Sequence, residues 1–125
     1  MARSVGFEGI GAGALVYFKS ALTRGTDENK LVKVSADETV ALCADGEDVY
    51  GIVRVIDAKD KLAGVQINGI VADYPALHAT IPPLGFAHVI AKTASQVQLK
   101  AATAGWKVRR VIKSDDTNHL CTFEL

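Results

Sequence analysis

The stretch that decides the fold reads Leu62-Ala63-Gly64-Val65-Gln66-Ile67-Asn68-Gly69-Ile70-Val71. In an extended chain, successive side chains point to opposite faces, so the apolar side chains at positions 63, 65, 67 and 71 share one face. Gln66 and Asn68 share the other face. This alternation predicts a half-buried β-strand with one side in the core and one side in water.

The same period of two recurs along the chain. Residues 32–34 and 96–101 alternate apolar and polar side chains, as half-buried strands do. Clusters rich in Ser, Asp, Gly and Asn separate such segments, and they predict hairpin connections at residues 35–38, 44–48, 57–60 and 114–118. The pattern predicts an all-β fold, a compact small barrel or sandwich of the β-tulip type.

Two segments depart from simple alternation. Residues 49–56 are apolar on both faces except at Arg54, which predicts a central strand that is covered on two sides or crosses a subunit contact. Residues 14–18 fit a strand or a short helix. The β-branched and aromatic run Val16-Tyr17-Phe18 favours the strand.

Length and composition limit the classes of protein to consider. With 125 residues, 49% of them hydrophobic, we expect one folded domain, residues 14–125, preceded by an N-terminal arm, residues 1–13. Fourteen basic residues balance fourteen acidic ones, so no net field attracts nucleic acid or an anionic membrane. We therefore expect neither as a partner.

The cysteines and the first residues indicate the compartment. Cys43 and Cys121 have apolar neighbours, which predicts buried reduced thiols. The chain begins without an apolar leader segment and contains no stretch of membrane-spanning length. We expect synthesis in a cytosol.

The chain also resembles itself when it is shifted by about half its length. At a spacing of 57, Val32, Val40 and Leu42 match Val89, Val97 and Leu99; at a spacing of 56, Val55, Ile56, Val65 and Ile67 match Val111, Ile112, Cys121 and Phe123. The pattern predicts two related units, residues 31–71 and 86–125. Chance alignment of two alternating segments is the open alternative.

Signals of catalysis and of cofactors are weak. The glycine spacing of residues 9–14 matches a dinucleotide fingerprint, but only eight residues precede it, too few for the strand that must position it. His78, His88 and His119 lie far apart in sequence and form no pair with metal-ligand spacing. We therefore expect no catalytic residue, metal or cofactor, and interpret the chain as a binding protein rather than an enzyme.

Aromatic and basic residues supply candidates for contacts. Lys107, Arg109 and Arg110 form a local basic cluster beside Trp106. Large amphipathic rings and arginines concentrate binding energy at interfaces. The candidate subunit-interface residues are Tyr50, Arg54, Tyr74 and Trp106. A carbohydrate-binding or ligand-binding β module is an alternative, which requires these aromatic rings to line one groove.

Three segments carry a resemblance to a known family. They read Leu31-Val32-Lys33-Val34-Ser35-Ala36-Asp37-Glu38-Thr39-Val40, then Asp45-Gly46-Glu47-Asp48-Val49-Tyr50-Gly51-Ile52-Val53, then Gly64-Val65-Gln66-Ile67-Asn68-Gly69-Ile70-Val71. This succession of strand, Ser-Ala-Asp turn, strand, acidic turn and Gly-Ile-Val strand resembles the capsid cement, or decoration, proteins of tailed bacteriophages. The likeness covers residues 31–71, about a third of the chain.

The resemblance implies a structural virion protein without an active site. Such a protein binds the major capsid protein on the outside of the shell, often as a homotrimer, and stabilises the capsid against packaged DNA. The arm would supply capsid contacts through Arg3, Ser4, Val5, Phe7 and Ile10, for example by adding a strand to a sheet edge. Another virion component, such as a tail-tube or head-fibre base subunit, is a second alternative.

Overall fold

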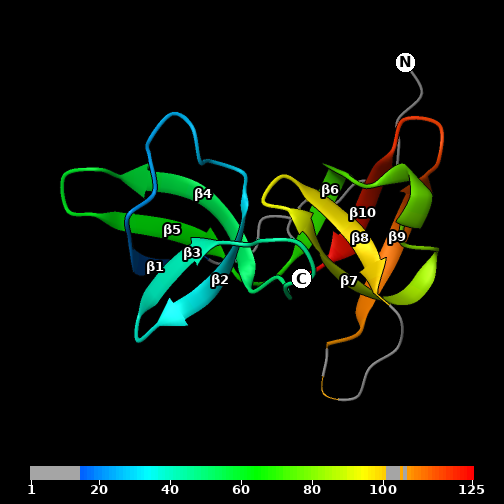
Figure 1. The fold of residues 1–125 in the computed structure, drawn as a ribbon, viewed down its shortest axis with the longest axis horizontal. Helices are drawn as coiled ribbons and strands as arrows, with labels where there is room; N and C mark the ends of the chain where they lie inside the picture. Colours follow the sequence, from blue (N-terminus) through cyan, green and yellow to red (C-terminus); the bar gives the residue numbers. More distant parts are fainter. Residues whose placement is uncertain (1–14, 101–104, 106) are drawn as a thin grey trace.

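The computed structural model describes residues 15–100, 105 and 107–125, which form two β lobes (Figure 1). The described elements are β1 (Leu15–Ser20), β2 (Leu31–Ala36), β3 (Thr39–Leu42), β4 (Gly51–Asp57), β5 (Leu62–Gln66), β6 (Ile70–Pro75), the short 3₁₀ helix η1 (His78–Thr80), β7 (Gly85–Thr93), β8 (Gln96–Lys100), β9 (Arg109–Asp115) and β10 (Leu120–Glu124). The all-β prediction is confirmed, and residues 15–20 form a strand as the β-branched run predicted. No helix in these ranges has the length and apolar character to cross a bilayer.

The first lobe, residues 15–66, is a closed barrel with strand order β1-β3-β2-β4-β5. Strand β1 closes it by pairing antiparallel with β5 on one side and parallel with β3 on the other. The barrel encloses a small aliphatic core of Val32, Val40, Val53, Ile56, Ala63 and Val65. Closure leaves this lobe with no free sheet edge.

The second lobe, residues 70–124, is a five-stranded sheet with order β6-β10-β9-β7-β8. Its edge strands approach each other where a single parallel bridge joins Ala76, just after β6, to Val97. Phe123, fully buried, packs edge-on against Tyr74 at a centroid distance of 6.4 Å in the centre of this lobe.

The two lobes share one pattern of strand pairing. In order, β1 to β5 pair with one another as β6 to β10 do. In the β2–β3 hairpin, Val32 pairs with Leu42 and Val34 with Val40. In the β7–β8 hairpin, Val89 pairs with Leu99 and Ala91 with Val97, 57 positions further along. The parallel pair Ser20–Val40 has its counterpart in the Ala76–Val97 bridge.

The second hairpin of each lobe corrects the spacing inferred from the sequence. Asp57 pairs with Leu62 and Val53 with Val65, as Asp115 pairs with Leu120 and Val111 with Phe123. These equivalents are 58 positions apart, not 56. Both hairpins have a bulge at the same place and a left-handed residue before the second strand, Lys61 at φ 54° and His119 at φ 56°. The match of Val55-Ile56 to Val111-Ile112 in the sequence did not take this backbone register into account.

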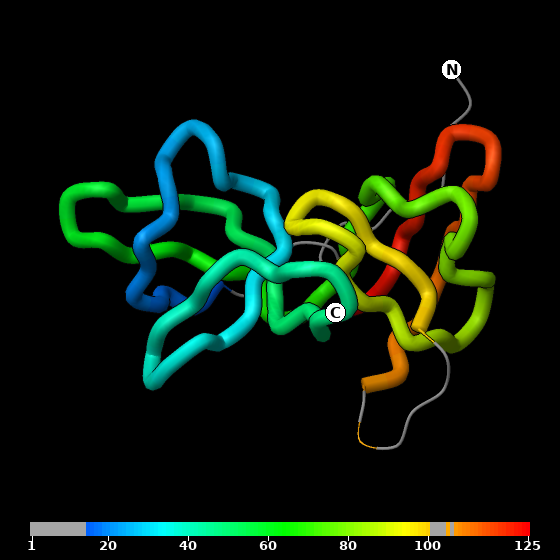
Figure 2. Tube along the Cα trace, in the orientation of Figure 1, coloured from blue at the N-terminus to red at the C-terminus, as the bar shows by residue number. Residues whose placement is uncertain are grey.

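The lobes meet in a shared core. Leu31, Cys43, Val49 and Ile52 of the first lobe belong to the cluster that fills the second lobe. The connection between β3 and β4 pairs with β7 through hydrogen bonds from Gly46 N to Ala91 O and from Ala91 N to Glu47 O. Residues 44–48 therefore form an inter-lobe strap rather than a hairpin turn, because β3 and β4 are not neighbours. The C-terminal Leu125 lies beside the junction and bonds to Gly69 O (Figure 2).

The junction explains why residues 49–56 are apolar on both sides. Ile52 and Val53 are both fully buried, whereas Val55, beyond the junction, is 45% exposed. The start of β4 is thus covered by its own barrel on one face and by the second lobe on the other.

The strand predicted over residues 62–71 is interrupted. Strand β5 ends at Gln66 and β6 begins at Ile70, with Gly69 at φ 87° between them. The polar face predicted for this segment is wrong at Gln66, which is 3% exposed. Its amide accepts a hydrogen bond from Arg54 Nε and donates one to Asn68 O. Barrel closure buries this position, since Gln66 pairs with Leu15 on one side and Ile52 on the other.

Candidate functional site

The second lobe exposes an apolar face on β7 and β9. We define the second-lobe face as Leu84, Phe86, Val108, Arg110 and Ile112. Phe86 is 70% and Leu84 66% exposed. Phe86 pairs with Arg110, whose guanidinium lies 5.7 Å from the ring centroid. Contiguous exposed apolar side chains on a rigid sheet mark interaction sites.

Alternation along β9 sets this face. Arg109 and Val111 point into the molecule at 4% exposure each, so Arg110 and Ile112 point outward. The basic cluster of the sequence is therefore split: Arg109 is a buried residue at the lobe junction, while Lys107 and Arg110 are exposed.

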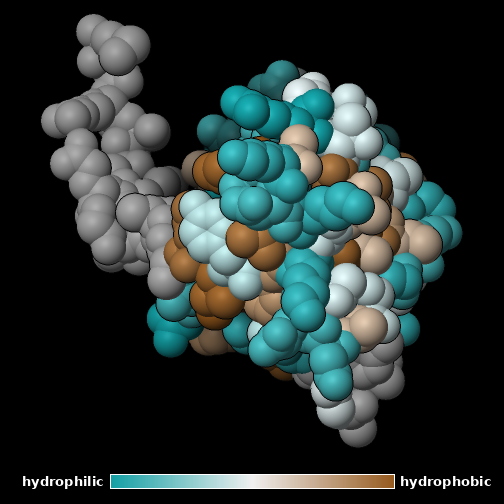
Figure 3. All heavy atoms as spheres, turned by 90° about the vertical axis from the view of Figure 1, so that its left-hand side faces the viewer, coloured by the Kyte–Doolittle hydropathy of each residue, from teal (hydrophilic) through white to brown (hydrophobic). Residues whose placement is uncertain are grey.

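The first lobe exposes a different apolar row. Val55, Gly64 and Tyr17 pair across three adjacent strands, and a Cβ on Gly64 would lie 3.3 Å from the Tyr17 ring. In the second lobe, Lys113 pairs with Thr122, and Asp73 N donates to Thr122 Oγ1. Lys113 and Asp73 form an ion pair of 2.9 Å there. Because the same row is built with charges in one lobe, the apolar Tyr17 and Val55 are not required by the fold. Figure 3 views this lobe and shows apolar surface between hydrophilic regions.

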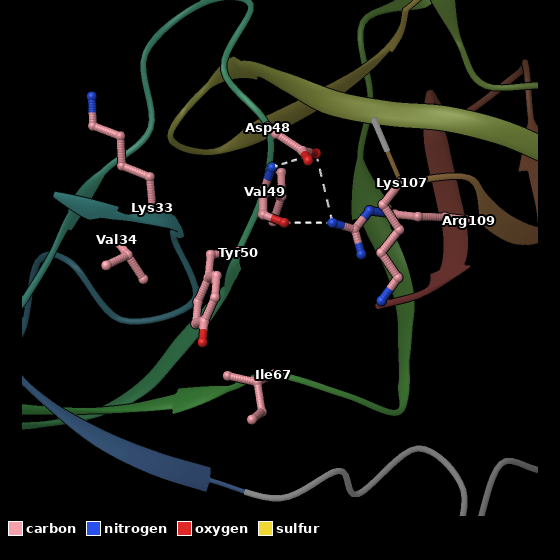
Figure 4. A pocket seen from close by; sticks show the side chains of 8 residues that line it. All are labelled: Lys33, Val34, Asp48, Val49, Tyr50, Ile67, Lys107 and Arg109. Carbon is pink, nitrogen blue, oxygen red and sulfur yellow. Dashed lines mark hydrogen bonds and ion pairs between the residues drawn. The ribbon is translucent and has the colours of Figure 1, made fainter. Parts of the chain in front are cut away.

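A groove of about 460 Å³ lies between the lobes. We call it the inter-lobe groove; it is lined by Lys33, Val34, Asp48, Val49, Tyr50, Ile67, Lys107 and Arg109. Figure 4 shows Val34, Tyr50 and Ile67 across from Lys107 and Arg109. The side with Val34, Tyr50 and Ile67 is thus mainly apolar but also carries Lys33, and the other side carries Lys107 and Arg109 with Asp48 beside them.

Most charges of the inter-lobe groove are paired. Lys33 Nζ bonds to Glu47 at 2.5 Å. The Arg109 guanidinium donates to Val49 O and lies 3.7 Å from Asp48 Oδ1 (Figure 4). Burial lowers the pKa of Arg109 by disfavouring its charge, while Asp48 opposes that shift. Lys107 is exposed and has no ion-pair partner among the described residues.

A second groove, of about 450 Å³, has Arg54 and Tyr74 in its lining. Arg54 donates to Gln66 Oε1 and Asn29 Oδ1, and Tyr74 donates to Asn29 O at 2.7 Å. Burial raises the pKa of Tyr74 to about 12. Through these bonds, Arg54 of the first lobe and Tyr74 of the second lobe both hold Asn29, which precedes β2. Their role is therefore structural.

The predicted interface residues that the structure describes fall into two grooves, with Tyr50 in the inter-lobe groove and Arg54 with Tyr74 in the second groove. Tyr50 is 47% exposed in the inter-lobe groove, whereas Tyr74 is 6% exposed. The Tyr74 ring is covered by its own chain, so little of it is available to a second subunit. Arg54 is half-buried and bonded within the chain. Since Tyr50 and Tyr74 line different grooves, no shared aromatic platform for carbohydrate forms between them.

Several predicted residues lie outside the described residues. They are Trp106 and the arm residues Arg3, Ser4, Val5, Phe7 and Ile10.

The thiols are placed as predicted. Cys43 and Cys121 are free and buried, at 5% and 0% exposure. Burial raises the pKa of each to about 12. Both thiols are therefore protonated at neutral pH and unsuited to nucleophilic attack.

The histidines are closer than their spacing indicated. His78 and His119 contact each other with ring centroids 4.4 Å apart, and His78 Nδ1 lies 3.2 Å from Asp116 Oδ1. Within the described part of the chain, no three His, Cys, Asp or Glu side chains gather as metal ligands.

No protein-family model matches the chain, and no curated protein matches it.

Proposed function

We propose that this chain is a structural virion protein that binds the outer surface of a tailed-phage capsid, as a homotrimer, and stabilises the shell. The observation that carries the proposal is the second-lobe face, where Phe86 in β7 and Leu84 just before β7 are more than half exposed. A decoration protein needs such a preformed surface, because a rigid surface loses little conformational entropy on binding.

Two further features support the proposal. The three segments that resemble decoration proteins form β2 with β3, the strap leading into β4, and β5 with β6. The N-terminal segment contains Val5, Phe7 and Ile10 among glycines, which suits an arm that buries apolar side chains on a partner. Several such arms in one oligomer would strengthen attachment by raising the effective concentration.

The test is cosedimentation of the purified protein with undecorated expanded capsids. We expect saturable binding by the wild type and at least tenfold weaker binding by Phe86→Thr/Ile112→Thr. The matched control, Tyr17→Thr/Val55→Thr, removes an exposed apolar pair from the first lobe and should bind like the wild type. Deletion of residues 2–13 should abolish binding and leave the two lobes folded. A wild-type protein that stays in the supernatant refutes the proposal.

A further inference from the structure

The inter-lobe groove has one cation more than its own anions neutralise. Its lining and the adjacent strap contain Lys33, Lys107 and Arg109 against Glu47 and Asp48. Glu47 neutralises Lys33, and Asp48 faces Arg109. Lys107 is an exposed ammonium at the edge of the groove and has no ion-pair partner in the part of the chain that the structure describes. The groove therefore attracts a single carboxylate.

The buried Arg109 in the lining of the groove adds to the attraction for a carboxylate. Its side chain is 3% exposed, and its Nε is buried without a hydrogen-bond partner among the described residues. A buried guanidinium with an unused donor is under-compensated, and its charge acts through a medium that screens less than water.

The side of the groove opposite Lys107 favours apolar groups on a ligand. Tyr50 is 47% and Val34 44% exposed, and Ile67 is half-buried beside them. A ligand that complements both walls has one carboxylate flanked by apolar side chains. A nucleic-acid strand does not fit, because it would bring several phosphates to one unpaired cation.

The chain contains such a sequence in Phe7-Glu8-Gly9-Ile10. Glu8 is the only acidic residue among the first 26, and Phe7 and Ile10 flank it. Leu15, where the described structure begins, pairs with Gln66, the neighbour of Ile67 in the groove. Leu15 is seven positions after Glu8, which allows a reach of up to about 25 Å.

We propose that the inter-lobe groove is the binding site for residues 7–10 of the same chain, with the Glu8 carboxylate on Lys107 and apolar side chains against Tyr50, Val34 and Ile67. In the free protein, the arm then occupies the inter-lobe groove of its own chain. In the function proposed above, the arm leaves this groove when it binds the capsid. The inference itself concerns only the free protein, so it stands or falls independently of capsid binding.

The test is zero-length cross-linking of the full chain with a water-soluble carbodiimide. The reagent activates the Glu8 carboxyl, and Lys107 Nζ then attacks it. The product is an amide, with the net loss of one water from the protein, and mass spectrometry identifies the joined peptides. We expect the Glu8–Lys107 link at least tenfold above any Glu8–Lys59 link; Lys59, on the β4–β5 turn, is the control because it is also an exposed lysine.

Two variants and an isotope mixture complete the test. Glu8→Gln should shift the backbone amide resonances of Tyr50 and Ile67 while leaving those of Phe86 and Ile112 in place. Lys107→Arg keeps the charge but cannot form the amide, so it should remove the cross-link without shifting Tyr50 or Ile67. In a mixture of ¹⁴N and ¹⁵N protein, the link should join peptides of one isotope only. Equal cross-linking to Lys59, unchanged Tyr50 and Ile67 resonances in Glu8→Gln, or mixed-isotope links would each overturn the proposal.

Discussion

Two phenylalanines of the second lobe offer a matched test of its inside and outside. Phe123 is fully buried and contacts Tyr74, whereas Phe86 is 70% exposed on the opposite side of the sheet. Phe123→Ala removes a ring from a packed core, a change that costs about 4 kcal/mol including the cavity it leaves. Phe86→Ala loses a minor share of buried ring area and some β-propensity, about 1 kcal/mol together.

The assay is urea unfolding at constant pH, followed by far-ultraviolet circular dichroism. With a denaturant dependence of about 1.5 kcal/mol/M for a domain of this size, the midpoint should fall by about 2.5 M for Phe123→Ala and by less than about 1 M for Phe86→Ala. A loss of about 4 kcal/mol is a large share of the stability of an ordinary domain, so Phe123→Ala should be marginal. Equal midpoints for the two variants would refute the assignment of the exposed face.

Three further predictions follow from the same structure. Burial raises the pKa values of Cys43, Cys121 and Tyr74 to about 12, from 9.0 for the thiols and 10.0 for the phenol. As pH rises, the unfolded chain therefore loses these protons before the folded chain does. The free energy of unfolding should consequently fall between about pH 9 and pH 12. Constant melting temperatures between pH 8 and 11, or thiols that react with a disulfide reagent before denaturation, would contradict this. Gln66→Ala should cost about 2 kcal/mol in urea unfolding because Arg54 Nε and Asn68 O both lose a buried partner, while Gln96→Ala, at a half-buried position in β8, should cost less than about 0.5 kcal/mol; similar costs would show that the bonds of Gln66 contribute nothing. The triple variant Tyr17→Asp/Gly64→Thr/Val55→Lys transfers the second lobe's row into the first lobe and should fold with a melting temperature within a few degrees of the wild type, so an unfolded product would argue against the equivalence of the two rows.

Local patterns in the sequence predicted where the strands lie better than they predicted which of their side chains the rest of the molecule buries. The run Val16-Tyr17-Phe18 lies in β1, and the cysteines with apolar neighbours are buried. The predicted exposure of Gln66 was wrong because alternation assigns one face of every strand to solvent. Barrel closure instead places β5 between β1 and β4. Its burial depends on Arg54, a partner twelve residues away that only the β4–β5 hairpin brings near.

The candidate surfaces were harder to predict for the same reason. Alternation separates Arg109 and Val111 from Arg110 and Ile112, but it does not say which pair the rest of the molecule covers. Phe86 is a large apolar residue of the kind that usually fills a core, and only the folded structure shows that its ring is 70% exposed, with the Arg110 guanidinium 5.7 Å from its centroid. The inter-lobe groove arises where the strap and β9 meet, so no contiguous stretch of sequence contains it.

The central claim, a place on the outside of a capsid, is tested most directly by electron cryomicroscopy of phage particles assembled in cells that express this chain. The account predicts two-lobed density on the exterior of the shell, repeated at its symmetry axes in groups of three, with the second-lobe face toward the shell. Density for the chain in the tail tube or at the base of a head fibre, or a shell without it, would contradict the account.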